Sequence, residues 1–200
     1  MNPIFDIIKQ YKSNSTTRFS IDTYHYEMAK IAIKNGFNII NDVSGFKDNR
    51  MWNLLRDNDI EAIIMHSLTI PADRKITLTK NCDPVKEIKL WIRNIIKKCN
   101  QNNIDLSKII IDPGIGFNKT AVQSLKIIQN IKQLQNQKYR ILVGHSKKSF
   151  MQIFTQNDAQ DRLIETLGIS IELTKKGIDI IRVHDQIEHK RMFLANLYTI

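Results

Sequence analysis

Short apolar segments alternate with longer amphipathic segments along this chain. Each short segment is a nearly continuous run of apolar residues, mostly Ile, Val and Leu, which is typical of strands buried on both faces of a parallel sheet. We predict six strands, at Phe19–Asp22, Asn38–Asn41, Ala62–His66, Ile109–Asp112, Ile141–Gly144 and Ile178–Val183.

The longer segments have the spacing of helices with one buried face. Pro84–Asn102, for example, repeats its apolar residues at intervals of three and four, which places them on one side of a helix. Gly36 and Gly177 each follow such a segment and precede a strand, as helix-ending glycines do. We predict helices at Tyr24–Asn35, Asp48–Asn58, Pro84–Asn102, Val122–Gln135 and Asp161–Lys176.

This order of elements predicts repeated βα units and a parallel sheet with right-handed crossovers. Polar residues stand at or just after the carboxyl ends of most predicted strands, where (β/α)8 barrels build their active sites. We therefore predict an α/β fold of the TIM-barrel type. A complete barrel has eight strands and about 250 residues, so six strands in 200 residues predict an incomplete one. The polar residues are Asp22, Asn41, His66, Asp112, Ser146, Arg182 and His184.

Composition and charge narrow the classes of function. The chain is 42% hydrophobic and 25% charged, as expected for a single globular domain without a membrane span. Its net charge of +10 is spread over amphipathic segments without a basic run interleaved with aromatics, which predicts solvated helix faces rather than a nucleic-acid site. Cys82 and Cys99 lack metal-ligand spacing, and the N-terminus lacks a secretory pattern, so we expect reduced thiols in the cytoplasm.

Three segments carry the strongest chemical signals. In DPGIGFNKT, Pro113 ends a strand and two glycines permit a sharp turn, so that Asp112 can offer a carboxylate to the N–H groups of a planar heterocycle. In GHSKKSF, Ser146 and two lysines follow a strand and are expected to open an anion-binding helix, with Gly144 allowing close backbone approach. In RVHD, Arg182 and His184 share one face of a strand and suit a phosphate clamp.

Each of these segments also has a purely structural interpretation. Asp112 can cap a turn, the lysines can belong to an exposed helix start, and Arg182 can form an ordinary ion pair. A single histidine such as His66 is more often hydrogen-bonded structure than a catalyst. Asp22, Asn41 and Asp112 together would nevertheless suit a flat, amide-bearing ring, with Met65 as an apolar contact.

The segments SIDTY, IINDVSGF, DPGIGFNKT, GHSKKSF and RVHD, in this order and spacing, resemble dihydropteroate synthase, a pterin-binding transferase of folate synthesis. The resemblance extends from Arg18 to Asp185. It implies that residues 1–200 form one pterin-binding domain that contains strands 3 to 8 of the family barrel and lacks the first two βα units. Residues 1–17 are then expected to form the helix and connection that precede the third barrel strand.

The resemblance also implies a role for each candidate residue. The implied reaction joins 6-hydroxymethyl-7,8-dihydropterin diphosphate to p-aminobenzoate and releases pyrophosphate, with Mg2+ as cofactor. The implied pterin contacts are Asp22, Asn41, Met65, Asp112, Gly144 and Lys148. Phe117 and Ser149 are implied in p-aminobenzoate binding, and Arg182 and His184 in pyrophosphate binding. The implied catalytic residues are Asp112, Lys148, Arg182 and His184.

The chain departs from the family pattern in three places. The absent first strands carry the Asn that helps to hold the metal, so no metal ligand is expected here. The loop after His66 contains SLTIP instead of a Met-Gln-Gly-type sequence, and Asn118 and Lys147 replace the usual Gly and Arg. A barrel open at two edges should fold poorly alone, which leaves a decayed remnant, a part completed by a companion N-terminal polypeptide, or a piece of a longer chain. A homodimer is expected from the family.

Other functions compete with this interpretation. A pterin-binding methyltransferase domain shares the barrel and the Asp/Asn contacts, but does not require the Lys-Ser-Phe element or RVHD. An inactive or binding-only fragment would keep the pterin contacts without turnover. A generic phosphate-binding barrel accounts for fewer of the segments.

Overall fold

The computed structural model describes residues 7–8, 10–11, 16–73 and 75–198. Six strands form one sheet in chain order, and each pairs in parallel with the strand that follows it. The predicted fold class, an incomplete α/β barrel, is confirmed. The strands are β1 (Ser20–Asp22), β2 (Ile39–Asp42), β3 (Glu61–Met65), β4 (Ile109–Asp112), β5 (Arg140–Val143) and β6 (Ile180–Ile181).

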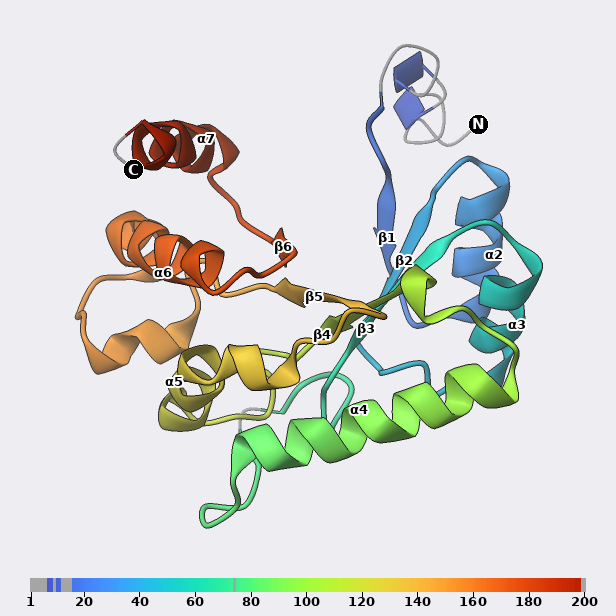
Figure 1. The fold of residues 1–200 in the computed structure, drawn as a ribbon, viewed down its shortest axis with the longest axis horizontal. Helices are drawn as coiled ribbons and strands as arrows, with labels where there is room; N and C mark the ends of the chain where they lie inside the picture. Colours follow the sequence, from blue (N-terminus) through green and yellow to red (C-terminus); the bar gives the residue numbers. More distant parts are fainter. Residues whose placement is uncertain (1–6, 9, 12–15, 74, 199–200) are drawn as a thin grey trace.

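Helices follow the strands along the outside of the curved sheet (Figure 1). Three of them begin at side-chain caps: the side chains of Asp48, Asp83 and Thr120 accept hydrogen bonds from backbone N–H groups in the first turn, a position that Asp and Thr favour. The helices are α2 (Tyr26–Lys34), α3 (Asn49–Asp57), α4 (Pro84–Gln101), α5 (Ala121–Gln129), α6 (Leu163–Lys175) and α7 (Gln186–Leu197).

The strands are apolar on both faces, as their continuous sequence runs predict. Ile63, Ile110 and Leu142 form a small buried cluster on one face. The other face joins the helices in a much larger core that includes Ile64 and Trp52. This division matches the twofold alternation of side chains along a strand.

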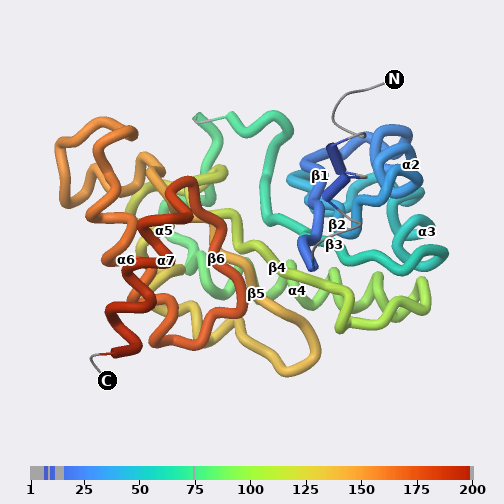
Figure 2. The backbone as a smooth tube through the Cα atoms, turned by 90° about the horizontal axis from the view of Figure 1, so that it is seen from above, coloured from blue at the N-terminus to red at the C-terminus, as the bar shows by residue number. Residues whose placement is uncertain are grey.

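The sheet does not close into a full barrel within the described residues. There, β1 pairs with β2 alone and β6 pairs with β5 alone. Seen from above, the two edges lie apart, with β1 beside the helices α2 and α3 and β6 beside α6 and α7 (Figure 2).

Several predicted boundaries are wrong. The last strand spans two residues, Ile180–Ile181, instead of six. Just before it, the Asp179 carboxylate accepts from the N–H of Ile141 at 2.8 Å in place of a backbone carbonyl. The helix predicted at Val122–Gln135 ends at Gln129 and continues as a short 3-10 turn. The helix α7 was not predicted. The prediction for residues 1–17 falls largely outside the described residues, although residues 7, 8, 10 and 11 are helical.

A side-chain clamp organises the loop 67–76 beside the turn that follows β4. The buried Asn118 has φ +49°. Its Oδ1 accepts from the N–H groups of Leu68 and Thr69 at 3.0 and 3.2 Å. Its Nδ2 donates to the carbonyls of Asp73 and Ile76 at 3.0 and 2.9 Å. The two departures noted in the sequence, SLTIP and Asn118, are therefore one structural unit.

We predict that Asn118→Gly lowers the free energy of unfolding by about 2–4 kcal/mol, because buried backbone groups of the loop lose their partners. Glycine accepts the positive φ, so this variant isolates the hydrogen bonds. Asn118→Ala should cost about 1 kcal/mol more, since its β-carbon disfavours the left-handed region. Urea unfolding measures both. The matched control is Asn103→Gly at an exposed asparagine with φ +54°, and equal stability of the two glycine variants would contradict the clamp.

Gly114 is the most tightly packed glycine of the turn after β4, and Gly144 serves as its control. Gly114 has φ +68°, and a β-carbon there would lie 2.1 Å from the carbonyl oxygen of His66. At Gly144, a β-carbon would make ordinary contacts of 3.9 Å and 4.0 Å. We therefore predict that Gly114→Ala lowers stability by about 3 kcal/mol or more, while Gly144→Ala folds like the parent. Equal thermal unfolding midpoints for the two variants would contradict this account.

Candidate functional site

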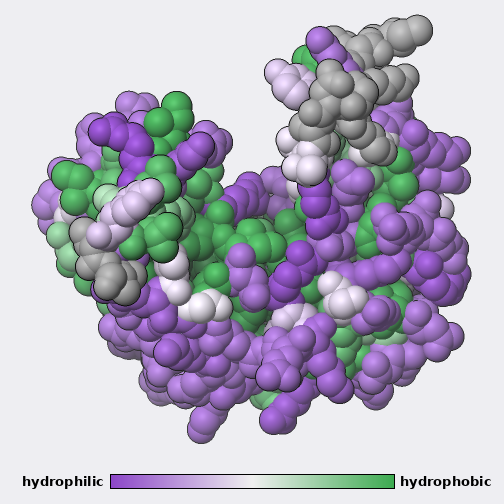
Figure 3. Space-filling model, turned by 45° about the horizontal axis from the view of Figure 1, so that its top comes forward, coloured by the Kyte–Doolittle hydropathy of each residue, from purple (hydrophilic) through white to green (hydrophobic). Residues whose placement is uncertain are grey.

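A cavity of about 620 Å³ lies at the carboxyl ends of the strands. Figure 3 shows this side of the molecule as a hollow with hydrophobic side chains gathered in its floor. Eight of the ten candidate residues from the sequence line the cavity, namely Asp22, Met65, Asp112, Phe117, Gly144, Lys148, Arg182 and His184. Residues far apart in the sequence therefore meet at this edge of the sheet, and their roles in binding stay predictions.

The register of the sheet explains how the first of these side chains meet. In β1 and β2, Asp22 lies beside Asn41, and in β3 and β4, Met65 lies beside Asp112. The amide of Asn41 donates to Oδ1 of Asp22. Asn41 is buried and does not belong to the described cavity lining, so it acts on the cavity through Asp22.

Asp112 provides a buried carboxylate at the cavity wall. Its side chain is almost fully buried, and its Oδ1 accepts from the N–H of Gly114 at 2.7 Å. Burial raises the pKa of Asp112, while the positive charges of Lys148, Lys119 and Arg182 and the Gly114 N–H act in the opposite direction. Desolvation therefore favours the protonated form of Asp112, whereas the three cations favour its ionised form.

Lys148 faces this carboxylate from the segment after β5. Its ammonium donates to the carbonyl of Ile115 and lies 4.5 Å from the centre of the Phe117 ring. Burial lowers the pKa of Lys148 to about 8, although the charge of Asp112 acts to raise it. Gly116 makes room for the lysine, since a β-carbon there would lie 3.2 Å from the Lys148 side chain.

The outer part of the cavity is polar and accessible. Arg182 donates to Oδ2 of Asp22 at 3.0 Å, and both side chains are more than half exposed. His184 lies 2.8 Å from the hydroxyl of Ser146 through its Nδ1. Arg182 and His184 follow β6 instead of lying on a strand as predicted, yet both line the cavity.

The structure differs from three expectations for the GHSKKSF segment. The residues after the lysines form a 3-10 turn, Ser149–Ile153, instead of an α-helix, and Lys147, with φ +57°, lies outside this turn. The turn therefore supplies no anion-binding helix N-terminus. Ser149 is exposed and lies outside the described lining of the cavity. Gly144 is not required for close backbone approach in this structure, since a β-carbon would fit.

Sequence reasoning missed part of the lining. Val43, Ala159, Gln160 and Val183 contribute to the cavity. Lys147, one of the two lysines expected to bind an anion, lines it as well. Val43 and Val183 lie within the quoted segments IINDVSGF and RVHD, and a systematic reading of residues after each strand would have found them. Ala159 and Gln160 come from a short 3-10 helix, Ala159–Asp161, and carry no sequence signal.

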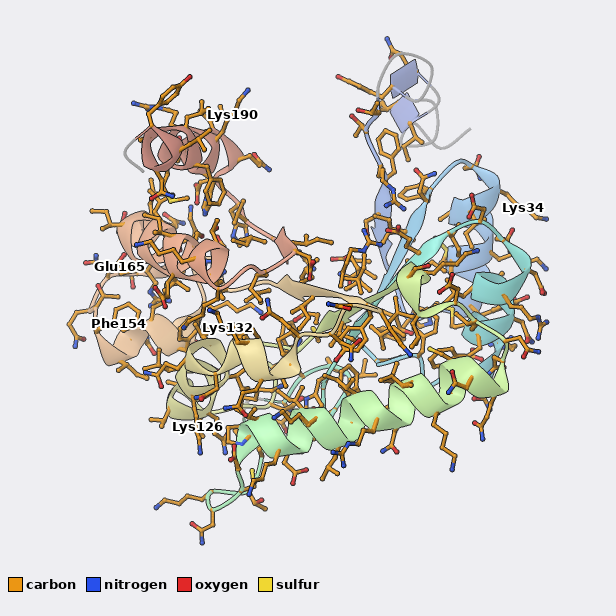
Figure 4. The ribbon with its side chains drawn as sticks, in the orientation of Figure 1. Lys34, Lys126, Lys132, Phe154, Glu165 and Lys190 are labelled. Carbon is orange, nitrogen blue, oxygen red and sulfur yellow. The ribbon has the colours of Figure 1, made fainter. Side chains whose placement is uncertain are left out.

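Most of the positive charge lies away from the cavity. In Figure 4, Lys34, Lys126 and Lys190 extend outward from the helical layer, and these three lysines and Lys132 are exposed. This arrangement supports the expectation of solvated helix faces. Within the part of the chain that the structure describes, no helix has the length and apolar character needed to cross a membrane.

Comparison with known sequences gives a consistent result. The family model described as "Pterin binding enzyme" matches residues 1–184. A folate synthesis bifunctional protein from Chlamydia muridarum is 36% identical over 180 residues, covering 88% of this chain and 39% of that protein. A dihydropteroate synthase from Clostridium beijerinckii is 32% identical over 190 residues, covering 94% of this chain and 68% of that protein. The chain thus spans less than half the length of the chlamydial relative.

Solved structures agree. The dihydropteroate synthase of Anaplasma phagocytophilum, with bound 6-hydroxymethylpterin-monophosphate, superposes with a TM-score of 0.86 at 28% identity, over 96% of this chain and 77% of that one. The enzyme from Thermus thermophilus has the same fold, with a TM-score of 0.85 at 23% identity over 98% and 76% of the two chains. Because the family model matches residues 1–184, this chain belongs to the pterin-binding enzyme family.

Proposed function

We propose that this chain carries the substrate-binding wall of a dihydropteroate synthase. The reaction joins 6-hydroxymethyl-7,8-dihydropterin diphosphate to p-aminobenzoate and gives 7,8-dihydropteroate and pyrophosphate. The observation that carries the proposal is the cavity in which a buried carboxylate, Asp112, and a half-buried ammonium, Lys148, lie inside a rim containing Arg182 and His184. The names of the relatives support the same reaction.

The role of each cavity residue in the proposed reaction follows from its position and charge. Asp112 accepts hydrogen bonds from the amino and ring N–H groups of the pterin, and Met65 packs on the ring. The bond between the methylene carbon and the diphosphate oxygen breaks, and its electron pair leaves with pyrophosphate. Arg182 and His184 stabilise that leaving charge. The amine of p-aminobenzoate, beside Phe117, forms the new C–N bond and releases its extra proton to solvent.

The proposed cofactor, Mg2+, has an incomplete set of ligands in this chain. Within the described residues, no group of three His, Cys, Asp or Glu side chains could hold a metal ion. The carboxylate of Asp22 at the cavity rim already accepts from Asn41 and Arg182. The described residues do not fit a resident metal on their own, and the steps above do not depend on one.

We further propose that additional βα units, in the same polypeptide or in another, close the sheet between β1 and β6. Within the described residues both edges are unpaired, and such edges favour the addition of strands. The match to 77% of the Anaplasma enzyme is consistent with this completion. The homodimer and the cytoplasmic location expected from the sequence remain predictions.

The proposal is tested by pyrophosphate release from the pterin diphosphate, with and without p-aminobenzoate. The chain is assayed alone and together with the N-terminal βα units of the Clostridium beijerinckii relative. We expect p-aminobenzoate-dependent release with the added units. A folded protein that shows no activity in either form would overturn the enzymatic function, whereas pterin binding without turnover would identify a binding protein.

Substitutions at the cavity should then abolish most of this activity. We predict that Lys148→Ala and Arg182→Ala each lower the rate by about a hundredfold or more, because each removes a charge that stabilises the transition state. The matched controls are Lys132→Ala and Arg56→Ala, which remove exposed charges on the outer surface. These controls should stay within about twofold of the parent. Near-normal rates for both cavity variants would show that the site assignment is wrong.

A further inference from the structure

Lys119 is a buried cation that the proposed reaction does not use. Its side chain is 7% exposed, and it lies behind the turn after β4, outside the described lining of the cavity. None of the ion pairs formed among the described residues includes it. A lysine that is buried without a carboxylate partner is costly, so its contacts require a specific explanation.

The Lys119 ammonium instead meets acceptors on two strand ends. It donates to the carbonyls of Phe117 at 2.9 Å and Gly114 at 3.0 Å. Two further acceptors belong to His66: its Nδ1 at 3.0 Å and its backbone carbonyl at 3.3 Å. The three N–H groups of the ammonium therefore face four acceptors. The contact with Nδ1 requires that nitrogen to be unprotonated, and burial lowers the pKa of His66 to about 3, which keeps the imidazole neutral.

These contacts connect Lys119 to Asp112 through one residue. The carbonyl of Gly114 accepts from Lys119, and the N–H of Gly114 donates to Oδ1 of Asp112 at 2.7 Å. On the cavity side, Lys148 donates to the carbonyl of Ile115 in the same turn. The turn is therefore held between two ammonium groups, and the orientation of Asp112 depends on it.

The electrostatic interactions of Lys119 support the same role as its hydrogen bonds. Three cations act on Asp112: Lys119 in its own turn, Lys148 in the segment after β5 and Arg182 in the segment after β6. Lys119 faces Asp112 and Lys148, as well as the neutral His66. Burial lowers the pKa of Lys119 to about 7, and the negative charge of Asp112 opposes this decrease. The carboxylate and the ammonium thus favour each other's ionised form.

We propose that Lys119 is a positioning residue for Asp112, which fixes the turn from behind the cavity and keeps the carboxylate ionised as an acceptor for the N–H groups of a pterin ring. The choice of ligand rests on the proposed function. The positioning role itself rests on the contacts of Lys119 and is tested separately.

The first test needs no ligand. The carboxyl carbon of Asp112 is titrated by 13C NMR and assigned with Asp112→Asn. In Lys119→Gln, which keeps amide donors but loses the charge, we expect the pKa of Asp112 to rise by about one pH unit. The matched control is Lys176→Gln, a lysine that also donates to backbone carbonyls, those of Ile128 and Gln129. It should leave Asp112 unchanged. An unshifted Asp112 in folded Lys119→Gln would overturn the proposal.

The second test uses 6-hydroxymethylpterin as the probe and follows its affinity against pH. In Lys119→Gln, the pH below which affinity falls should rise by the same amount, about one unit. At pH values between the Asp112 pKa of the parent and that of the variant, the variant should bind about tenfold more weakly. Lys119→Arg should restore it. A purely structural role would weaken binding equally at all pH values, which would contradict the proposal.

The two tests separate the possible failures. If the parent binds no pterin either alone or with the added βα units, the proposed function fails, while the carboxyl titration still decides the role of Lys119. If Lys119→Gln does not fold, Lys119→Arg decides instead, because arginine keeps the charge at every pH used. Its Asp112 should titrate within a few tenths of a unit of the parent. A folded arginine variant in which the Asp112 pKa rises by a full unit would overturn the proposal.

Discussion

The candidate site depends on one constraint, the burial of the Asp112 carboxylate. A buried charge is tolerated when cations and hydrogen-bond donors replace its hydration. Here Lys119, Lys148 and Arg182 supply the cations, and the N–H of Gly114 supplies a hydrogen bond. The cations follow three neighbouring strands, β4, β5 and β6. The parallel sheet, whose carboxyl ends meet at one edge, is therefore what makes this carboxylate possible.

The turn after β4 shapes the wall of the cavity beside this carboxylate. Gly114 allows the chain to pass against the carbonyl of His66, and Gly116 leaves room for Lys148. Asn118 attaches the loop 67–76 to the far side of the same turn. Short-range geometry in the turn thus couples three features that are distant in sequence: the end of β3, the loop after it, and the lysine that follows β5.

Much of the fold was predictable because its signals are local. Continuous apolar runs identify the strands, and periodic apolar residues identify most helices. The strand ends then place Asp112, Lys148 and Arg182 at one edge, because parallel strands share their direction. The helix α7 was missed because its apolar residues do not form one buried stripe, and His189 is its buried residue.

Other features depend on tertiary contacts that no local pattern encodes. Asn118 looks like a mild replacement in the sequence, yet it bonds backbone groups more than 40 residues away. Lys119 follows a turn, where lysines are normally exposed, and its burial comes from the approach of β3. Ser149 was placed in the site by resemblance, but it is exposed and lies outside the described lining of the cavity.

The central claim is that Asp112 is the acceptor for a pterin ring in this cavity. The most direct measurement is a crystal structure of the chain with 6-hydroxymethylpterin bound. The account predicts the ring between Met65 and Lys148, with its amino and ring N–H groups within hydrogen-bond distance of the Asp112 carboxylate. A ring bound elsewhere, or in this cavity without a hydrogen bond to Asp112, would contradict the account.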